Sequence, residues 1–156
     1  MSEKQWIGAI VGVGLLARLG VMLAPFRWQL QHILPDDAFY YFTTARNIAE
    51  GNGITFDRIA DTNGFHPLWM GAIVPFWGLF SCDTLPIRGV LLLCGVLDLA
   101  TVVIFYRLGV LLGWRRSLRL GVAAAHAVSP FLIAHFGTMN GLETSAAVML
   151  LSLSLY

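Results

Sequence analysis

Long apolar runs separated by short polar joints dominate this chain. The first run, residues 6–26, contains a single charged residue, Arg18. A helix of that length reaches across about 30 Å of hydrocarbon, the core of a bilayer. Four later runs follow, at residues 67–81, 87–106, 118–136 and 142–156. The pattern predicts an all-α fold, a polytopic bundle of transmembrane helices that occupies residues 1–156. A cleaved signal peptide is the alternative for the first run, with Lys4 ahead of the apolar stretch, but no convincing small-residue cleavage site follows it.

A polar stretch, residues 27–66, interrupts the apolar pattern and holds 8 of the 19 formally charged residues. Apolar spacing within it predicts a helix over residues 37–50, with Asp36 as its N-cap and the glycines of residues 51–53 ending it. Its predicted apolar face comprises Ala38, Tyr41, Phe42, Ala45, Ile48 and Ala49. Such a helix suits a membrane surface. We expect an irregular loop over residues 54–64 and Pro67 in the first turn of the next helix.

Composition narrows the class of protein. The chain is 57% apolar and 12% charged, about half the charge of a soluble domain. This excludes an ordinary soluble domain and a disordered tail, and a net charge of +1 gives no reason to expect nucleic acid as a partner. Two cysteines, Cys82 and Cys94, form no disulfide framework. Because the chain stops inside an apolar stretch, we expect it to be the N-terminal part of a larger protein or one subunit of an assembly.

The charges give conflicting indications of orientation. Lys4 predicts a cytoplasmic N-terminus, which places residues 27–66 outside. Arginines should mark a further cytoplasmic joint, and four of them lie in one short region: Arg107, Arg115, Arg116 and Arg119. That joint falls outside if residues 67–81 and 87–106 both cross the membrane. Either one of these two segments does not span the membrane, or the arginines are an exception to the tendency of positive charges to lie on the cytoplasmic side.

Two adjacent carboxylates, Asp36 and Asp37, follow the first predicted span. They could accept a proton from an attacking hydroxyl or hold a divalent cation. They could equally serve the helix alone, one as its cap and the other at its positive end.

Polar groups also interrupt the chain where it re-enters the membrane. Thr62, Asn63 and His66 gather hydrogen-bond donors at the level of a lipid phosphate, ahead of a helix N-terminus at Pro67 that favours anions. A solvated turn, followed by Trp69 in the aromatic belt, explains the same residues. Further along, Glu143 is either a second acidic site residue or a helix cap.

Charged residues inside the apolar runs are costly unless they are paired. An ion pair between Arg18 and Asp98 would join two helices, although the sequence gives no evidence that they meet. His126 and His135 are predicted to form hydrogen bonds between helices. Motifs typical of zinc, nucleotide or serine-hydrolase sites are absent from the sequence.

The segment DDAFYYFTTARNIAEGNGITFD at residues 36–57, followed by TNGFHPLW at residues 62–69, resembles the GT-C fold membrane glycosyltransferases. Protein mannosyltransferases and the aminoarabinose transferases that modify lipid A belong to this superfamily. The resemblance is strong in the first loop and looser around Ser129-Pro130 and residues 140–143. It implies a polyprenyl-phosphate-linked sugar donor, an extracytoplasmic glycan, lipid or protein acceptor, and a place in the bacterial cytoplasmic membrane.

The resemblance also implies roles for individual residues. Asp36 matches the leading acidic position, a general base, with Asp37 beside it. His66 matches a basic residue before proline that faces the lipid phosphate, with Arg46 as a second cation and Asn63 nearby. Glu143 resembles a second acidic position, but three crossings between residues 66 and 137 would place it on the opposite face from Asp36. A divalent metal could assist, although the sequence supplies no diagnostic ligand set.

Two other classes remain open. The chain could be a non-catalytic membrane subunit, or a truncated relic of such an enzyme. A transporter would need charges within its spans, for which Arg18 and Asp98 are thin support.

Overall fold

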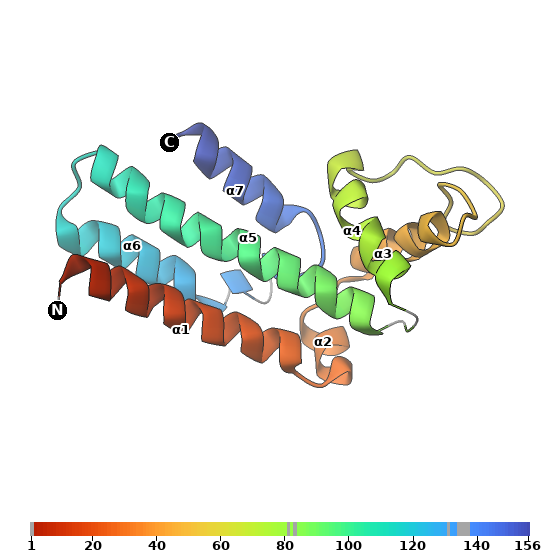
Figure 1. Cartoon of the computed structure of the whole chain (residues 1–156), viewed down its shortest axis with the longest axis horizontal. Coiled ribbons are helices and arrows are strands. Elements are labelled where there is room, and N and C mark those ends of the chain that lie inside the picture. The colour runs from red at the N-terminus through yellow and green to blue at the C-terminus, as the bar shows by residue number, and fades with distance from the viewer. Residues whose placement is uncertain (1, 81, 83, 131, 134–137) are drawn as a thin grey trace.

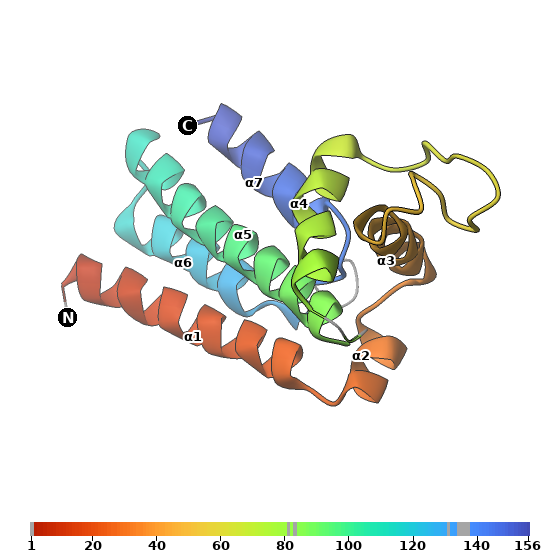
Figure 2. The ribbon, with the colours of Figure 1, turned by 45° about the vertical axis from the view of Figure 1, so that its right-hand side comes forward.

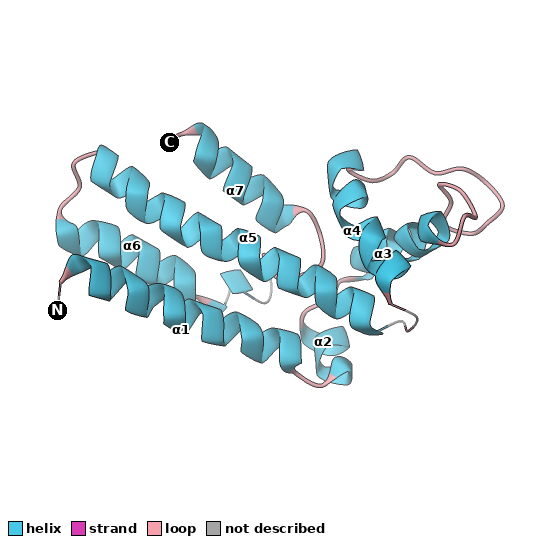
Figure 3. Ribbon diagram, viewed as in Figure 1, coloured by secondary structure: helices cyan, strands magenta, loops and turns pink. Residues whose placement is uncertain are grey.

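The computed structural model describes residues 2–80, 82, 84–130, 132–133 and 138–156. In these residues the regular secondary structure is helical, with no strand (Figures 1 and 3). The helices are α1 (Glu3–Leu23), α2 (Phe26–His32), α3 (Asp36–Ala49), α4 (Pro67–Leu79), α5 (Thr84–Leu111), α6 (Arg116–Val128) and α7 (Thr144–Ser154). The predicted all-α fold is therefore confirmed.

Two of these helices, α1 and α5, are long and apolar enough to cross a membrane. They correspond to the first and third predicted spans, although α5 extends beyond residues 87–106 at both ends. The central helix is α5, which packs against α1, α4, α6 and α7. By contrast, α4 and α6 have 13 residues each, too few to cross about 30 Å of hydrocarbon as straight helices.

The predicted continuous span over residues 118–136 is wrong as a single helix, because α6 ends at Val128. Pro130 explains the break. Proline disfavours helical geometry in the residue before it, and Ser129 accordingly has extended dihedrals. Residues 131 and 134–137, including His135 with its predicted role, lie outside the described residues.

The bundle has two ends that differ in character (Figures 1 and 2). At the end we call the loop end, α2, α3, the loop after it and α4 all lie together. The opposite end, which we call the basic end, carries the start of α1 and the turn between α5 and α6. Helix α4 lies across the loop end at a steep angle to α5 and does not run the length of the bundle. The joint that contains Arg107 to Arg119 therefore lies at the same end as Lys4, which favours the first of the two orientation alternatives.

A buried polar cluster joins α1, α5 and α6. The guanidinium of Arg18 donates to the carboxylate of Asp98, with Nε 2.9 Å from Oδ2, and to the carbonyls of Gly14 and Ala127. His126 Nε2 lies 2.8 Å from the other Asp98 oxygen. The Arg18 and Asp98 side chains are 2% and 0% exposed, so the pair that the sequence left open does form inside the bundle. The predicted interhelical bond of His126 is confirmed.

Helix α3 begins one residue earlier than predicted. Its N-cap is Pro35, which makes no side-chain cap, so the assignment of Asp36 as N-cap is wrong. Proline imposes the extended conformation that ends the preceding segment. Both Asp36 and Asp37 then fall in the first turn, where free backbone N–H groups favour negative charge.

The apolar face of α3 packs against α4. Four members of the predicted face are buried, Ile48 is half-buried and Ala49 is exposed. Gly51, with a positive φ of 79°, follows the end of the helix as expected. The loop is irregular, as predicted, apart from one bridge between Thr55 and Asp61. Pro67 occupies the first turn of α4, also as predicted.

Candidate functional site

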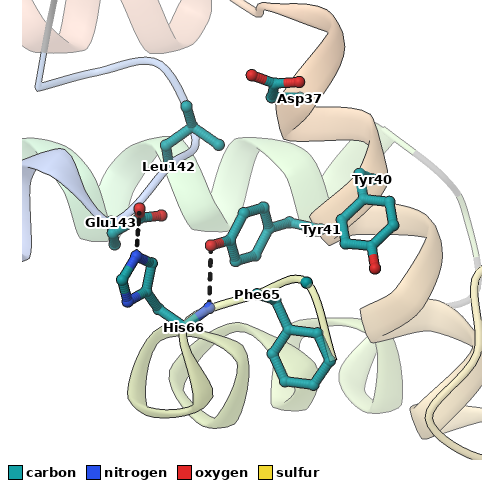
Figure 4. Close-up of a pocket in the computed structure, with 8 residues that line it drawn as sticks. Asp37, Tyr40, Tyr41, Phe65, His66, Leu142 and Glu143 are labelled. Carbon is teal, nitrogen blue, oxygen red and sulfur yellow. Dashed lines mark hydrogen bonds and ion pairs between the residues drawn. The ribbon is translucent and has the colours of Figure 1, made fainter. Parts of the chain in front are cut away.

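A cavity of about 570 Å³ opens at the loop end, between three segments that are distant in sequence (Figure 4). The first turns of α3 provide one wall and the residues just before α4 a second. The chain entering α7 provides the third. The lining residues are Asp37, Tyr40, Tyr41, Gly64, Phe65, His66, Leu142 and Glu143.

The side chains of His66 and Glu143 meet at this cavity, with His66 Nε2 3.2 Å from Glu143 Oε1. The His66 side chain is 69% exposed and that of Glu143 30% exposed. The second oxygen of Glu143, Oε2, is buried and accepts no hydrogen bond within the described part of the chain. A buried carboxylate oxygen without a donor is costly, and the Tyr41 hydroxyl is the neighbouring group that interacts with this carboxylate.

Tyr41 connects α3 with the segment just before α4. Its hydroxyl accepts a hydrogen bond of 3.0 Å from the backbone N–H of His66. Burial raises the pKa of the Tyr41 phenol above 10.0, and the nearby Glu143 carboxylate acts in the same direction. The phenol is therefore neutral at physiological pH, and part of the shift comes from a side-chain hydrogen bond with Glu143.

Glu143 is held at the site by the turn that precedes it. Gly141 has a positive φ of 82°, and a Cβ at this position would lie 2.6 Å from Cζ of Phe42. The Trp69 indole donates to the Gly141 carbonyl over 3.1 Å. Glu143 occupies the N-cap position of α7 but makes no side-chain cap. Its side chain is directed to His66 instead, as Figure 4 shows.

The structure brings three of the six predicted site residues to the cavity: Asp37, His66 and Glu143. Asp36 is exposed and lies outside the lining, although it neighbours Asp37 in sequence. Asn63 is likewise exposed and outside the lining. Arg46 lies in the last turn of α3, 3.9 Å from Glu50, and does not line the cavity.

Tyr40, Tyr41 and Phe65 also line the cavity, although the sequence analysis did not predict them as site residues. Helical spacing contains the missing signal for the tyrosines, because residues three and four positions after Asp37 lie on the same face of a helix. Tyr40 also anchors the loop, stacking on Phe56 with ring centroids 5.3 Å apart and hydrogen bonding Thr62. Phe65 depends on how the loop folds back onto α3, which no local pattern indicates.

An apolar groove of about 300 Å³ adjoins the cavity, between α4, α5 and α7. His66 and Glu143 line both spaces. The remaining groove residues are almost entirely apolar: Leu68, Trp69, Ala72, Leu93, Leu97, Ala146, Ala147 and Leu150. The polar cavity and the apolar groove therefore meet at His66 and Glu143.

The residues of the site do not form a dedicated metal centre. Among the residues that the structure describes, no three His, Cys, Asp or Glu side chains are grouped to hold a metal ion. Asp36 and Asp37 are adjacent but have no third ligand beside them. We therefore derive the chemistry of the site from its protein groups.

Comparisons with known protein families, with curated proteins and with solved structures found no match to this chain.

Proposed function

We propose that this chain is a membrane glycosyltransferase, or its N-terminal module, that transfers a sugar from a polyprenyl-phosphate donor to an extracytoplasmic acceptor. The observation that carries the proposal is the junction of the polar cavity with the apolar groove at His66 and Glu143. A lipid-linked sugar has a polar head and a long apolar tail, and each needs its own surface. The resemblance of residues 36–57 and 62–69 to GT-C enzymes supports the same function.

In the proposed reaction, an acceptor hydroxyl attacks the anomeric carbon of the donor sugar. A new carbon–oxygen bond forms as the bond to the phosphate oxygen breaks, and the configuration inverts. The polyprenyl phosphate leaves with the bonding electron pair. The hydroxyl proton passes to the carboxylate of Asp37, the acidic residue of α3 that lines the cavity.

The remaining groups position the donor. The His66 imidazole, oriented by Glu143, donates to the departing phosphate and stabilises its growing charge. Glu143 and Tyr41, which both line the cavity, contact the sugar hydroxyls. Asp36 and Asp37 are both exposed, but only Asp37 lines the cavity, so this version of the mechanism assigns the base to Asp37.

We further propose that α1 and α5 cross the bacterial cytoplasmic membrane, with α6 and α7 packed beside them. Five of the ten Lys and Arg residues lie at the basic end, which supports a cytoplasmic location for that end. The cavity at the loop end then faces outward, where transfer would occur. Because α4 does not traverse the bundle, Glu143 and Asp37 share one side of the membrane.

The test compares two neighbouring carboxylates in the full-length protein. Membranes that contain Asp37→Asn or Asp36→Asn are supplied with polyprenyl-phosphate mannose or polyprenyl-phosphate aminoarabinose, and the release of polyprenyl phosphate is measured. Losing a general base lowers the rate by about 10²- to 10⁴-fold, so we expect this loss in Asp37→Asn. Asp36→Asn should stay within a few-fold of the unmodified protein, and both variants should insert normally.

The reverse result, with activity lost only in Asp36→Asn, would assign the base to Asp36. Inserted protein without transfer from either donor in any form would count against the enzyme and favour a non-catalytic membrane subunit.

A further inference from the structure

A second cavity, of about 610 Å³, lies far from the candidate site, at the basic end between α1 and α5. About two turns of α1 form one wall, and the last turns of α5 form the other. Its lining combines two cations with a mostly apolar surface: Lys4, Ile7, Gly8, Val11, Val103, Tyr106, Arg107 and Val110.

The cations of this cavity are not neutralised by the protein. Glu3 precedes Lys4 in the sequence, and its carboxylate is already engaged. It binds the Arg119 guanidinium, with Arg119 Nε 2.6 Å from Oε1, and accepts a hydrogen bond from the Tyr106 hydroxyl. Within the described residues, Lys4 and Arg107 have no acidic partner, so the cavity keeps an excess of positive charge.

The cavity is also open along α1. A Cβ at Gly8 would meet nothing within 4 Å, and neither would one at Gly12 one turn further on. Because Gly8 has no side chain, it leaves space in the cavity. A flexible hydrocarbon chain can therefore lie between Ile7, Val11 and Val103. The two cations then stand at the level of the membrane surface, where the apolar part of α1 begins.

We propose that this cavity binds an anionic phospholipid of the cytoplasmic leaflet. Its phosphate would lie between Lys4 and Arg107 and one acyl chain along the apolar wall. Basic pockets between membrane helices on the cytoplasmic side suit such lipids, and a positively charged rim discriminates against a zwitterionic headgroup. The inference requires α1 and α5 to lie in a bilayer, but it does not depend on glycosyl transfer.

The test measures lipid binding by native mass spectrometry of the purified full-length protein, with phosphatidylglycerol and phosphatidylcholine as probes. We expect a preference for phosphatidylglycerol. A cation near the membrane surface contributes about fivefold to the affinity for an anionic lipid, so the Lys4→Gln, Arg107→Gln double variant should lose on the order of 20-fold. Arg115→Gln is the matched control for each of the single variants Lys4→Gln and Arg107→Gln, because it removes one exposed charge from the same end outside the cavity.

A second pair of variants tests the shape of the cavity. Gly8→Leu places a side chain in the cavity and should weaken phosphatidylglycerol binding several-fold. Gly12→Leu adds the same side chain to an equally open position outside the lining and should not. Thermal unfolding in phosphatidylcholine nanodiscs identifies any variant that fails to fold.

Equal losses in Arg115→Gln and in the single variants Lys4→Gln and Arg107→Gln would show diffuse attraction to charge and overturn the proposal. So would an unchanged lipid preference in the double variant. Inorganic phosphate at millimolar concentration should not displace the lipid, and full displacement would show that the acyl chain contributes nothing.

Discussion

At the scale of single residues, Asp98 connects three helices. Its carboxylate is fully buried in α5 and contacts Arg18 of α1 and His126 of α6. A guanidinium inside the bundle is tolerated because this carboxylate compensates its charge and two carbonyls accept its remaining N–H groups.

We expect Asp98→Asn to lower the free energy of unfolding by about 3–5 kcal/mol, because it leaves the Arg18 charge buried without a counter-ion. Chemical unfolding of the purified protein in detergent micelles measures the loss. The Arg18→Met, Asp98→Asn double variant has no buried charge in the pair and should be more stable than Asp98→Asn alone. Strictly additive effects of the two substitutions would contradict the proposed charge compensation.

At the scale of elements, the turn before α7 decides where Glu143 lies. Gly141 has a left-handed backbone conformation and lies close to Phe42. A methyl group at this position is therefore disfavoured both by the backbone conformation and by contact with the Phe42 ring. Gly51 has a similar φ, of 79°, but open space around its Cβ position, which makes it a natural control.

We predict that Gly141→Ala destabilises the protein more than Gly51→Ala. The left-handed conformation costs about 1–2 kcal/mol in both variants. Crowding against Phe42 adds a further 1–3 kcal/mol in Gly141→Ala alone. Unfolding in micelles compares the two, and equal destabilisation would mean that the turn relaxes away from Phe42 without cost.

Local sequence patterns predict some of the helix boundaries correctly and others not. Gly51 and Pro67 mark the end of α3 and the start of α4 correctly, because each acts through its own backbone. The apolar run over residues 118–136 predicts one helix, but the helix ends at Val128. Apolar character alone does not indicate the effect of Pro130 on the residue before it. The start of α3 differs by one residue for a related reason, the conformation of Pro35.

At the scale of the whole molecule, the arrangement of helices determines which loops share a side. With α4 lying across the loop end, Asn52 and Ser117 fall at opposite ends of the bundle (Figure 1). Ser2 and Ser117 fall at the same end.

Cysteine labelling in intact cells tests this topology. With exposed Cys82 replaced by Ser, an impermeant maleimide should label Asn52→Cys from outside. It should reach Ser2→Cys and Ser117→Cys only after the membrane is permeabilised. Labelling of both Asn52→Cys and Ser117→Cys from outside would show that residues 67–81 cross the membrane after all.

The sequence by itself determined the helical class, the polar stretch after the first run and three of the residues that line the cavity, Asp37, His66 and Glu143. These follow from hydropathy, helix-ending residues and the chemical types that such sites need, all of which are local. Only the tertiary structure decided that Asp37 and not Asp36 lines the cavity, and that His66 meets Glu143. It alone paired Arg18 with Asp98. Each of these contacts joins residues from separate helices, or depends on the rotation of one helix against another, and packing of the whole bundle sets both.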